Sequence, residues 1–447
     1  MIKKERLEKK NLNIVNSFIK FFQLEVLSGF ILIGISITAI IIANSHLSHI
    51  YHEFVHLPIK IGVGQFQIKN SLSHWVNDAL MGLFFLLVGL EIKREFLIGE
   101  LSSIEKAILP AISALGGMVF PAIIYFFVAR NNPELIRGWA IPMATDIAFA
   151  LGILSITGKK FPFSLKVFLT AFATIDDIGG VIVIALFYTE KIVLISLLLM
   201  AITFGLMIFC NKINIKNPAV YFILGTFLWF FTLKSGIHAT VAGILTAFAV
   251  PAKGSIDIKK FFEEIGVLLK RIRKKIVDID NSLIIAKKTY NEIETIEEVC
   301  HKFQPPLLRI EHTLHPWVTF FILPLFAFVN AGIEIPKNFS EILFSKISIG
   351  IFLGLFFGKQ IGIFLFTLLA VKFKLANLPK GISWKMVYGI SILGGIGFTM
   401  SMFINSLAFK NNLQFINQAK VGILFSTLIA SIYGIIFLRF LKDDKKV

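Results

Sequence analysis

Stretches of apolar residues recur along the chain and are separated by short polar segments. A helix of about 20 apolar residues crosses the hydrocarbon core of a bilayer, and twelve stretches approach or exceed that length. They lie near residues 25–44, 75–97, 107–128, 137–156, 163–188, 192–210, 218–233, 236–250, 317–331, 347–371, 386–404 and 419–440. The pattern predicts an all-α polytopic membrane protein with about twelve transmembrane helices, several of them short enough to be broken or buried.

Two regions interrupt this series and are expected to stay outside the membrane. Residues 45–72 form a His-rich outer loop, and alternating apolar and polar residues over 59–68 predict a small periplasmic β-hairpin in it. Residues 251–312 mix charges with apolar residues at helical spacing, which predicts one or two amphipathic cytoplasmic helices ending before Pro305-Pro306.

The chain is thereby divided into five parts. These are a basic cytoplasmic arm, transmembrane helices 1–8, the cytoplasmic loop, transmembrane helices 9–12 and a cytoplasmic tail, over residues 1–24, 25–250, 251–312, 313–440 and 441–447.

Composition excludes several classes of protein. Hydrophobic residues make up 56% of the 447 positions and charged residues 16%, against about 25% charged residues in soluble domains. A soluble enzyme, a secreted disulfide scaffold and a disordered chain do not fit these values. Cys210 and Cys300 are too few for a disulfide framework and are expected to be free thiols. We expect neither an enzyme activity nor a cofactor.

The net charge of +17 is explained by the orientation of the chain. If the amino terminus is cytoplasmic and the spans alternate, 34 of the 45 Lys and Arg residues lie on the inner side and 10 on the outer side. Without the long loop the ratio is still 22 to 10, in line with the rule that positive charges stay inside. Both termini are therefore predicted to be cytoplasmic, and no nucleic-acid partner is expected.

Ionisable side chains within the apolar stretches are the main functional signal. Each costs several kcal/mol to insert into a bilayer, so each is a candidate site residue. They are Asp78, Glu91, Glu95, Asp146, Asp176, Asp177, His238 and Lys359.

Asp176 and Asp177 are adjacent in the fifth span. Neighbours on a helix point about 100° apart, so both carboxylates can face one cavity. Two close carboxylates do not both ionise cheaply, and either a cation such as Na⁺ or Li⁺ or two protons can neutralise them. Competition between metal and protons is the physical basis of an antiporter. The alternative is a structural ion pair with Lys359 that only sets helix register.

Two spans contain helix-breaking residues at comparable places in the two halves of the chain. Pro142 precedes Asp146 in span four, where a break would let Asp146 offset a helix dipole and let Thr145 cap a helix or bind an ion. Span eleven contains the glycine-rich run Gly394-Gly395-Ile396-Gly397. Ordinary kinks or close glycine packing are alternatives, but paired breaks are typical of inverted-repeat transporters with a site near the midplane.

Lys359 lies within span ten, where a buried ammonium needs a carboxylate partner or loses its proton. Asp176 and Asp177 are the candidate partners, and Lys359 is also a candidate proton carrier. The residues alone leave this choice open.

Two other functions also remain: a sodium-coupled organic anion symporter, and an intramembrane hydrolase, which the adjacency of the two aspartates disfavours.

Short motifs in a fixed order carry a family resemblance over nearly the whole chain. They are Val76-Asn77-Asp78, residues 84–95 (FFLLVGLEIKRE), 144–150 (ATDIAFA), Ile175-Asp176-Asp177, 234–240 (KSGIHAT), 311–317 (EHTLHPW), 323–328 (LPLFAF) and 397–401 (GFTMS). In this combination the chain resembles the NhaA family of bacterial sodium/proton antiporters.

The resemblance implies a twelve-helix antiporter of the bacterial inner membrane, with inverted repeats and two broken, crossed helices in spans four and eleven. It implies export of Na⁺ or Li⁺ against inward H⁺, with Asp176 and Asp177 as the ion and proton site and Asp177 the more direct ligand. Asp146 and Lys359 would compensate the ends of the broken helices, with Lys359 paired to Asp176. The residues linked to pH response would be Glu91, Glu95, His238, Glu311, His312 and His315, and Asp78 would lie in the outer funnel.

One position departs from the pattern that the resemblance implies. Gln360 stands where a proline is expected after the Gly358-Lys359 pair. We expect this to relax span ten without abolishing exchange.

If two protons enter for each cation exported, transport is electrogenic and driven by voltage. The expected partners are Na⁺, Li⁺, H⁺, the lipid bilayer and a second copy of the chain in a homodimer.

Overall fold

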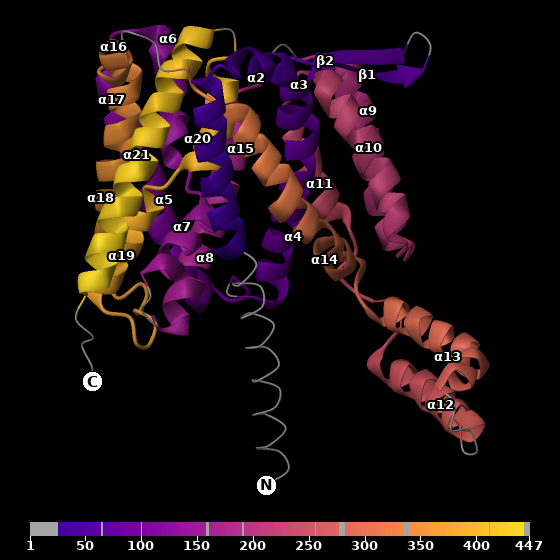
Figure 1. Ribbon diagram of the computed structural model, residues 1–447. Helices are drawn as coiled ribbons and strands as arrows, with labels where there is room; N and C mark the ends of the chain where they lie inside the picture. Colours follow the sequence, from indigo (N-terminus) through magenta and orange to yellow (C-terminus); the bar gives the residue numbers. More distant parts are fainter. Residues whose placement is uncertain are drawn as a thin grey trace. The chain divides into compact units, whose positions relative to one another are not determined.

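The computed structural model describes residues 26–63, 66–99, 101–157, 161–189, 192–254, 256–276, 282–334, 339–410 and 412–441. Helices make up most of it (Figure 1). The chain forms two compact units. The first unit contains Met1–Phe84, Glu95–Glu190 and Pro316–Val447, and the second contains Phe85–Arg94 and Lys191–His315.

The elements up to residue 187 follow the helix Val26–Ala43. They are α2 (Ser48–Val55), β1 (Pro58–Val63), β2 (Phe66–Ser71), α3 (Leu72–Trp75), η1 (Val76–Leu80), α4 (Met81–Ile98), α5 (Ile104–Ala129), α6 (Pro133–Ile136), η2 (Arg137–Met143), α7 (Ile147–Ile156) and α8 (Phe163–Phe187).

The remaining elements complete the second unit and return to the first. They are α9 (Leu194–Lys212), α10 (Pro218–Ser235), α11 (Thr240–Ala249), α12 (Ile258–Ile276), α13 (Ser282–Phe303), α14 (Pro306–Trp317), η3 (Val318–Ile322), α15 (Leu323–Ala331), α16 (Phe339–Leu343), α17 (Lys346–Leu353), η4 (Gly354–Gly358), α18 (Lys359–Lys372), α19 (Trp384–Gly394), α20 (Phe398–Ala408) and α21 (Leu413–Phe440).

All twelve predicted spans correspond to helices in the described part of the chain. Nine helices there are long and apolar enough to cross a membrane, and two further spans are bent helix pairs. The twelfth is α11, a shorter apolar helix. The ninth span differs from expectation, because its helix starts at Pro306 rather than near Trp317. Proline is well tolerated in the first turn of a helix, where its missing N–H is not needed.

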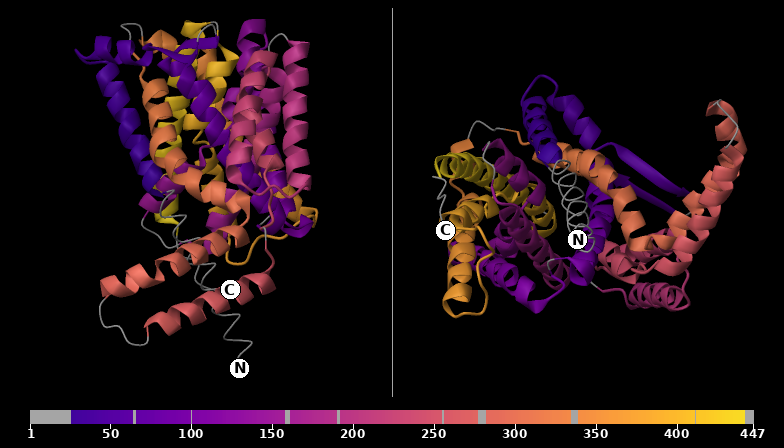
Figure 2. Two further views of the ribbon diagram at one scale, coloured as in Figure 1. Left: turned by 90° about the vertical axis from the view of Figure 1, so that its right-hand side faces the viewer. Right: turned by 90° about the horizontal axis from the view of Figure 1, so that it is seen from below.

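Both polar regions also form the elements that the sequence predicts. Strands β1 and β2 pair antiparallel, from Pro58 opposite Ser71 to Val63 opposite Phe66, and so form the predicted hairpin. Together with α2 they lie at one end of the first unit (Figures 1 and 2). The predicted amphipathic loop contains two helices, α12 and α13, which pack side by side (Figure 2).

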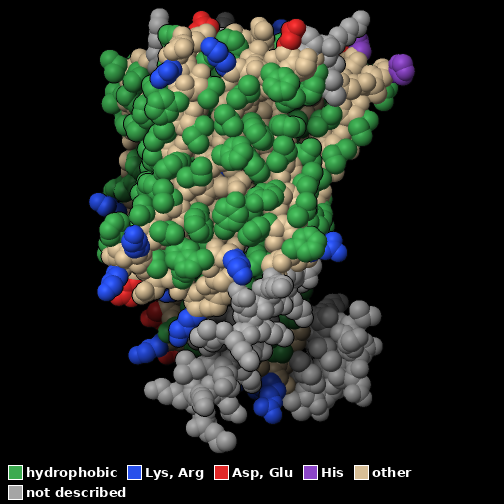
Figure 3. Space-filling view, turned by 90° about the vertical axis from the view of Figure 1, so that its left-hand side faces the viewer, with side chains coloured by type: hydrophobic (Ala, Val, Ile, Leu, Met, Phe, Trp, Pro, Cys, Tyr) green, Lys and Arg blue, Asp and Glu red, His purple; other side chains and the backbone are tan. Residues whose placement is uncertain are grey.

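The outside of the first unit is apolar over a broad area, as a lipid-facing surface requires. Figure 3 shows one such face, with hydrophobic side chains over most of it and Lys and Arg toward its two ends. Leu428, Ile432 and Ile436 contribute an exposed row along α21 at a spacing of four residues. The protein is therefore a multi-pass membrane protein, and its buried polar residues need a separate explanation.

Candidate functional site

Two broken helices of the first unit meet at their breaks. The pair α6–η2 and α7 bends by 51°, and the pair α19 and α20 by 41°. The Asp146 N–H donates to the Ile396 carbonyl at 2.7 Å, and the Thr145 hydroxyl donates to the Gly394 carbonyl at 3.0 Å. Helix ends leave backbone groups unsatisfied, and no lipid can satisfy them. Each break supplies the partners that the other lacks.

Asp146 connects the first turns of two half-helices. Its Oδ1 accepts from the Phe149 N–H at 2.9 Å, as an N-cap of α7. Its Oδ2 accepts from the N–H and the hydroxyl of Thr399, at 3.1 and 2.5 Å, in the first turn of α20. A helix N-terminus carries a partial positive charge, so one buried carboxylate stabilises two such termini at once.

The two adjacent aspartates lie on α8 in the interior of the same unit. Lys359, the first residue of α18, places its Nζ 2.7 Å from Asp176 Oδ2, and both side chains are 0% exposed. The Lys359 Nζ also lies 5.8 Å from the centre of the Phe172 ring, within cation–π range. This is a completely buried ion pair, with Asp177 buried beside it in sequence.

Oxygen atoms suited to a hard cation are present around this ion pair. Asp176 Oδ1 is buried and accepts no hydrogen bond from the described residues. Thr145, itself fully buried, lies close to the Asp176 carboxyl and so joins the helix breaks to α8. Alkali and alkaline-earth cations prefer oxygen ligands such as these carboxylates and this hydroxyl. Protons can neutralise the same carboxylates, so the arrangement allows either type of cation.

Close packing against α5 fixes the position of Lys359. A Cβ built on Gly362 would lie 2.1 Å from the Gly116 carbonyl oxygen, and one on Gly358 would lie 2.8 Å from the Pro121 Cα. Helices α5 and α18 therefore approach each other backbone to backbone. The π-helical segment η4 ends directly before Lys359, and such segments occur frequently at functional sites.

Gln360, where the resemblance leads us to expect a proline, is buried beside this packing. Its Oε1 accepts a hydrogen bond from the Tyr388 hydroxyl at 2.9 Å. The side chain thus connects α18 to α19, one half of a broken helix. Its expected effect on span ten stays a prediction.

The residues expected to respond to pH fall into several places. Glu311 forms an ion pair with Arg94 in the second unit, and both Glu311 and His315 are buried, whereas His312 is exposed. Glu91 belongs to the same unit, but Glu95 belongs to the first.

Two other predicted residues lie away from these acids along the chain. His238 precedes α11 and its Nδ1 is 2.8 Å from the Thr240 hydroxyl. Asp78, the predicted funnel residue, lies in the π-helical segment η1.

Sequence reasoning gave no site role to four residues with clear structural ones. Thr399 and Ser401 bond across the helix crossing, the latter donating to the Ile141 carbonyl at 2.8 Å. Lys93 donates to the Phe248 and Val250 carbonyls at 2.7 and 2.5 Å, at the C-terminus of α11. The position of Lys93 and Arg94 next to Glu91 and Glu95 could have marked them as site candidates. From the sequence, however, they contribute only to the prediction of the orientation of the chain.

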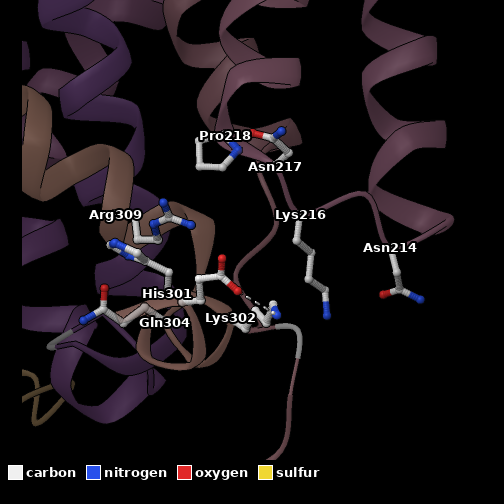
Figure 4. A pocket seen from close by; sticks show the side chains of 9 residues that line it. Asn214, Lys216, Asn217, Pro218, His301, Lys302, Gln304 and Arg309 are labelled. Atoms are coloured by element: carbon white, nitrogen blue, oxygen red, sulfur yellow. Dashed lines mark ion pairs between the residues drawn. The ribbon is translucent and has the colours of Figure 1, made fainter. Parts of the chain in front are cut away.

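An open pocket of about 360 Å³ occurs elsewhere, in the second unit. It lies between the turn from α9 to α10 and the end of α13, and Figure 4 shows Lys216, His301, Lys302 and Arg309 around it. None of the predicted site residues lines it. The pocket therefore gives no reason to move the candidate functional site away from the buried aspartates.

Comparison with known proteins shows which family this chain resembles. Residues 19–438 match the family described as Na⁺/H⁺ antiporter 1. The chain is 45% identical to the Na⁺/H⁺ antiporter NhaA 1 of Saccharophagus degradans, over 98% of this chain and 95% of that protein. It is 43% identical to the Na⁺/H⁺ antiporter NhaA of Pelagibacter ubique, over 96% and 98% of the two chains.

Proposed function

The chain belongs to the Na⁺/H⁺ antiporter 1 family and is a Na⁺/H⁺ antiporter, and on that premise we propose that Asp176 and Asp177 are where the two cations compete. The match over residues 19–438 leaves no support for an organic anion symporter. The observation that carries the proposal is the Lys359–Asp176 ion pair, fully buried beside Asp177.

The charges at this site explain why one ion excludes the other. Two carboxylates and one ammonium sum to one negative charge, which a single Na⁺ neutralises. Protonation of the same carboxylates removes the negative charge that binds Na⁺. Na⁺ and the protons are therefore not bound stably at the same time. Asp177 serves as the more direct ligand because Asp176 is already held by Lys359. Thr145 is a further oxygen ligand, and Asp146 stabilises the helix ends around the site.

Lys359 compensates charge at the site and is, with Asp176, one of two candidates for the second proton carrier. When Na⁺ binds the carboxylates, the ammonium loses part of the negative field that keeps it protonated in a dry environment. The second proton of the cycle comes either from Lys359 by this route or from Asp176, and it leaves toward the side from which Na⁺ arrived.

The first test is transport by the whole protein. Everted vesicles or proteoliposomes are given NaCl and the internal pH is followed. Asp177→Asn is expected to lower the sodium-driven pH change at least a hundredfold, because the carboxylate that binds both cations is lost. Asp257→Asn is a matched control in the cytoplasmic loop, where Asp257 only caps α12 and asparagine caps equally well. A pH change that survives Asp177→Asn at full size would contradict the proposal.

The ion range and the coupling follow from the same site. Li⁺ is expected to replace Na⁺ because a site of carboxylate and hydroxyl oxygens suits either small cation, whereas K⁺ is too large to bring these oxygens together. Entry of two protons for each exported cation moves net positive charge inward. A potential that is negative inside should therefore accelerate exchange. Equal rates with and without an imposed potential would show that the coupling is electroneutral.

The acids and histidines outside the ion site form a separate pH-responsive group. We assign this role to Glu91, Glu95, His238, Glu311, His312 and His315, with Asp78 in the outer funnel. The Arg94–Glu311 ion pair supports the assignment, because protonation of the buried Glu311 carboxylate would remove the negative charge that the partly exposed Arg94 contacts. Glu311→Gln should shift the pH dependence of exchange while leaving its maximal rate within about twofold. A pH profile unchanged by this substitution would remove Glu311 from the group.

The orientation and assembly are part of the proposal. The 34-to-10 distribution of Lys and Arg supports cytoplasmic termini in a bacterial inner membrane, with Na⁺ leaving and H⁺ entering the cell. A reporter that folds only in the cytoplasm should be active when fused after Val447. We further propose a homodimer, which cross-linking of the protein in native membranes would detect.

A further inference from the structure

The hairpin of α12 and α13 takes no part in the ion site, and one side of α12 carries an exposed apolar stripe. Ile258, Phe262 and Leu269 are 60%, 66% and 54% exposed. At 100° per residue these three positions lie within about 40° of one another around the helix. These three exposed side chains therefore form one stripe along the helix, whereas Val267 is exposed on the opposite side.

The packing partner of α12 covers a different side of the helix. Phe261 stacks on Phe303 of α13 with ring centres 4.3 Å apart, and Leu268 is 6% exposed. These contacts form the core of the hairpin. The stripe is thus not part of the hairpin core, and its residues keep more than half of their surface open in the described structure.

Positive charge accompanies the stripe on the same helix. Five of the six residues from 270 to 275 are basic, and among them Lys275 forms an ion pair with Glu292 at 2.6 Å. Arg273 lies about 40° from Leu269 around the helix, at the edge of the stripe. A helix with an apolar stripe and a strongly basic remainder is typical of segments that lie on anionic membrane surfaces.

The chain itself keeps this helix close to a bilayer. Eight residues separate the end of α11 at Ala249 from Ile258, and an extended chain of that length reaches at most about 28 Å. At its other end α13 is followed, after two residues, by α14, which continues into a membrane-spanning helix. Both ends of the hairpin are therefore tethered to spans, which raises the effective concentration of lipid around it.

We propose that α12 is a membrane-surface helix, with Ile258, Phe262 and Leu269 inserted among lipids and its basic side chains against anionic headgroups. The lipid surface is that of the cytoplasmic leaflet around the protein itself. This inference rests on the proposed orientation of the chain and is independent of the ion site. Anionic lipid is favoured over a neutral occupant because the stripe is accompanied by cations.

The experiment compares two labelled positions in the full-length protein. In a Cys210→Ser/Cys300→Ser background, Leu269→Cys and Val267→Cys each receive an environment-sensitive fluorophore. Val267 is the matched control, because it is 51% exposed on the same helix but about 160° away from Leu269. Both proteins are reconstituted into vesicles of phosphatidylcholine with phosphatidylglycerol, or of phosphatidylcholine alone, with spin-labelled lipid as quencher.

In anionic vesicles the label at position 269 should be quenched by the spin-labelled lipid, whereas the label at position 267 should not. One cation at an anionic surface shifts binding about fivefold, so adding Lys270→Gln and Arg273→Gln should reduce the bound-to-free ratio about 25-fold. High salt or vesicles of phosphatidylcholine alone should act in the same direction.

Several outcomes would overturn the inference. These are equal quenching at both positions, no quenching at either, or protection of position 269 that depends on the protein-to-lipid ratio, which would indicate a second copy. Antiport measured on the same vesicles separates this result from the ion site. Loss of exchange with intact quenching would count against the ion site alone.

Discussion

Lys359 and Asp176 form an ion pair in the interior of the first unit, where neither side chain is exposed to solvent. A buried ion pair of this kind contributes little net stability, because desolvation offsets most of the Coulomb attraction. A small contribution to stability is consistent with our proposal that the pair belongs to the ion site. Replacing one of the two residues leaves the other as an uncompensated buried charge. The pair can therefore be tested by comparing single and double substitutions.

Lys359→Met should lower the free energy of unfolding by about 3–5 kcal/mol, since it leaves the Asp176 carboxylate buried without its cation. The double variant Lys359→Met/Asp176→Leu should recover most of that loss, because both charges are then gone. The thermal midpoint of the purified protein, followed by tryptophan fluorescence, measures both. A double variant no more stable than the single one would show that the two side chains do not depend on each other.

Thr399 is a second residue whose contribution can be isolated. Its hydroxyl donates to the charged Asp146 carboxylate at 2.5 Å, and a hydrogen bond to a charged group contributes about 1.5–3 kcal/mol. Thr399→Val should therefore lower the thermal midpoint and slow exchange, whereas Thr399→Ser, which keeps the hydroxyl, should retain both. Equal behaviour of the two variants would mean that the hydroxyl is unimportant and that the N–H of residue 399 suffices.

Helix packing decides whether these side chains meet. The breaks in α6–η2/α7 and α19/α20 satisfy each other's backbone groups, and the contact of α5 with α18 brings Lys359 to α8. The glycines at that contact are needed because the two backbones approach too closely for a Cβ. Small residues at helix contacts are the usual route to such close approach in membranes.

Gly362→Ala should destabilise the protein by about 1–3 kcal/mol and lower the exchange rate, because the added Cβ would lie 2.1 Å from the Gly116 carbonyl and push α18 outward. Gly205→Ala is the matched control, since nothing lies within 4 Å of its added Cβ in α9. That variant should be neutral or slightly stabilised through helix propensity. Thermal midpoints and exchange rates of both variants give the comparison, and equal effects would contradict the packing argument.

For the molecule as a whole, ion binding and stability are linked. A ligand that binds only the folded protein stabilises it, by about 2.7 kcal/mol at a hundred times its dissociation constant. If protons compete with Na⁺ for the same carboxylates, as we propose, a rise in pH should strengthen Na⁺ binding. The stabilisation by Na⁺ should therefore grow as the pH rises and fall as the pH drops.

The corresponding measurement is the thermal midpoint in NaCl against choline chloride at equal ionic strength, at an acid and an alkaline pH. The difference between the two salts should be larger at the alkaline pH, and Asp177→Asn should abolish it at both. A difference that is independent of pH would show that Na⁺ and H⁺ use separate sites. A difference that persists in Asp177→Asn would place the stabilising Na⁺ elsewhere.

The sequence by itself determined the elements of this protein. Twelve spans, the β-hairpin and the two places of helix breakage were all predicted, because hydrophobic transfer into a bilayer and the effects of proline and glycine are local properties of the chain. Asp146, Asp176, Asp177 and Lys359 were also singled out locally, since an aspartate or lysine inside an apolar stretch is unusual in any fold, whereas Glu311, His312 and His315 were named only through the family resemblance. The start of α14 at Pro306 was missed because a proline can begin a helix as readily as end one.

Only the tertiary structure decided which of these residues meet. Lys359 pairs with Asp176, 183 positions away, and Asp146 binds Thr399, 253 positions away. Neither pairing can be read from spacing along one helix, because it depends on how separate helices pack and where their backbones approach. The roles of Lys93 and Arg94 were missed for the same reason, since their partners at α11 and Glu311 come from distant segments. The local sequence shows which ionisable residues lie within spans, and the close packing of helices decides which of them share a site.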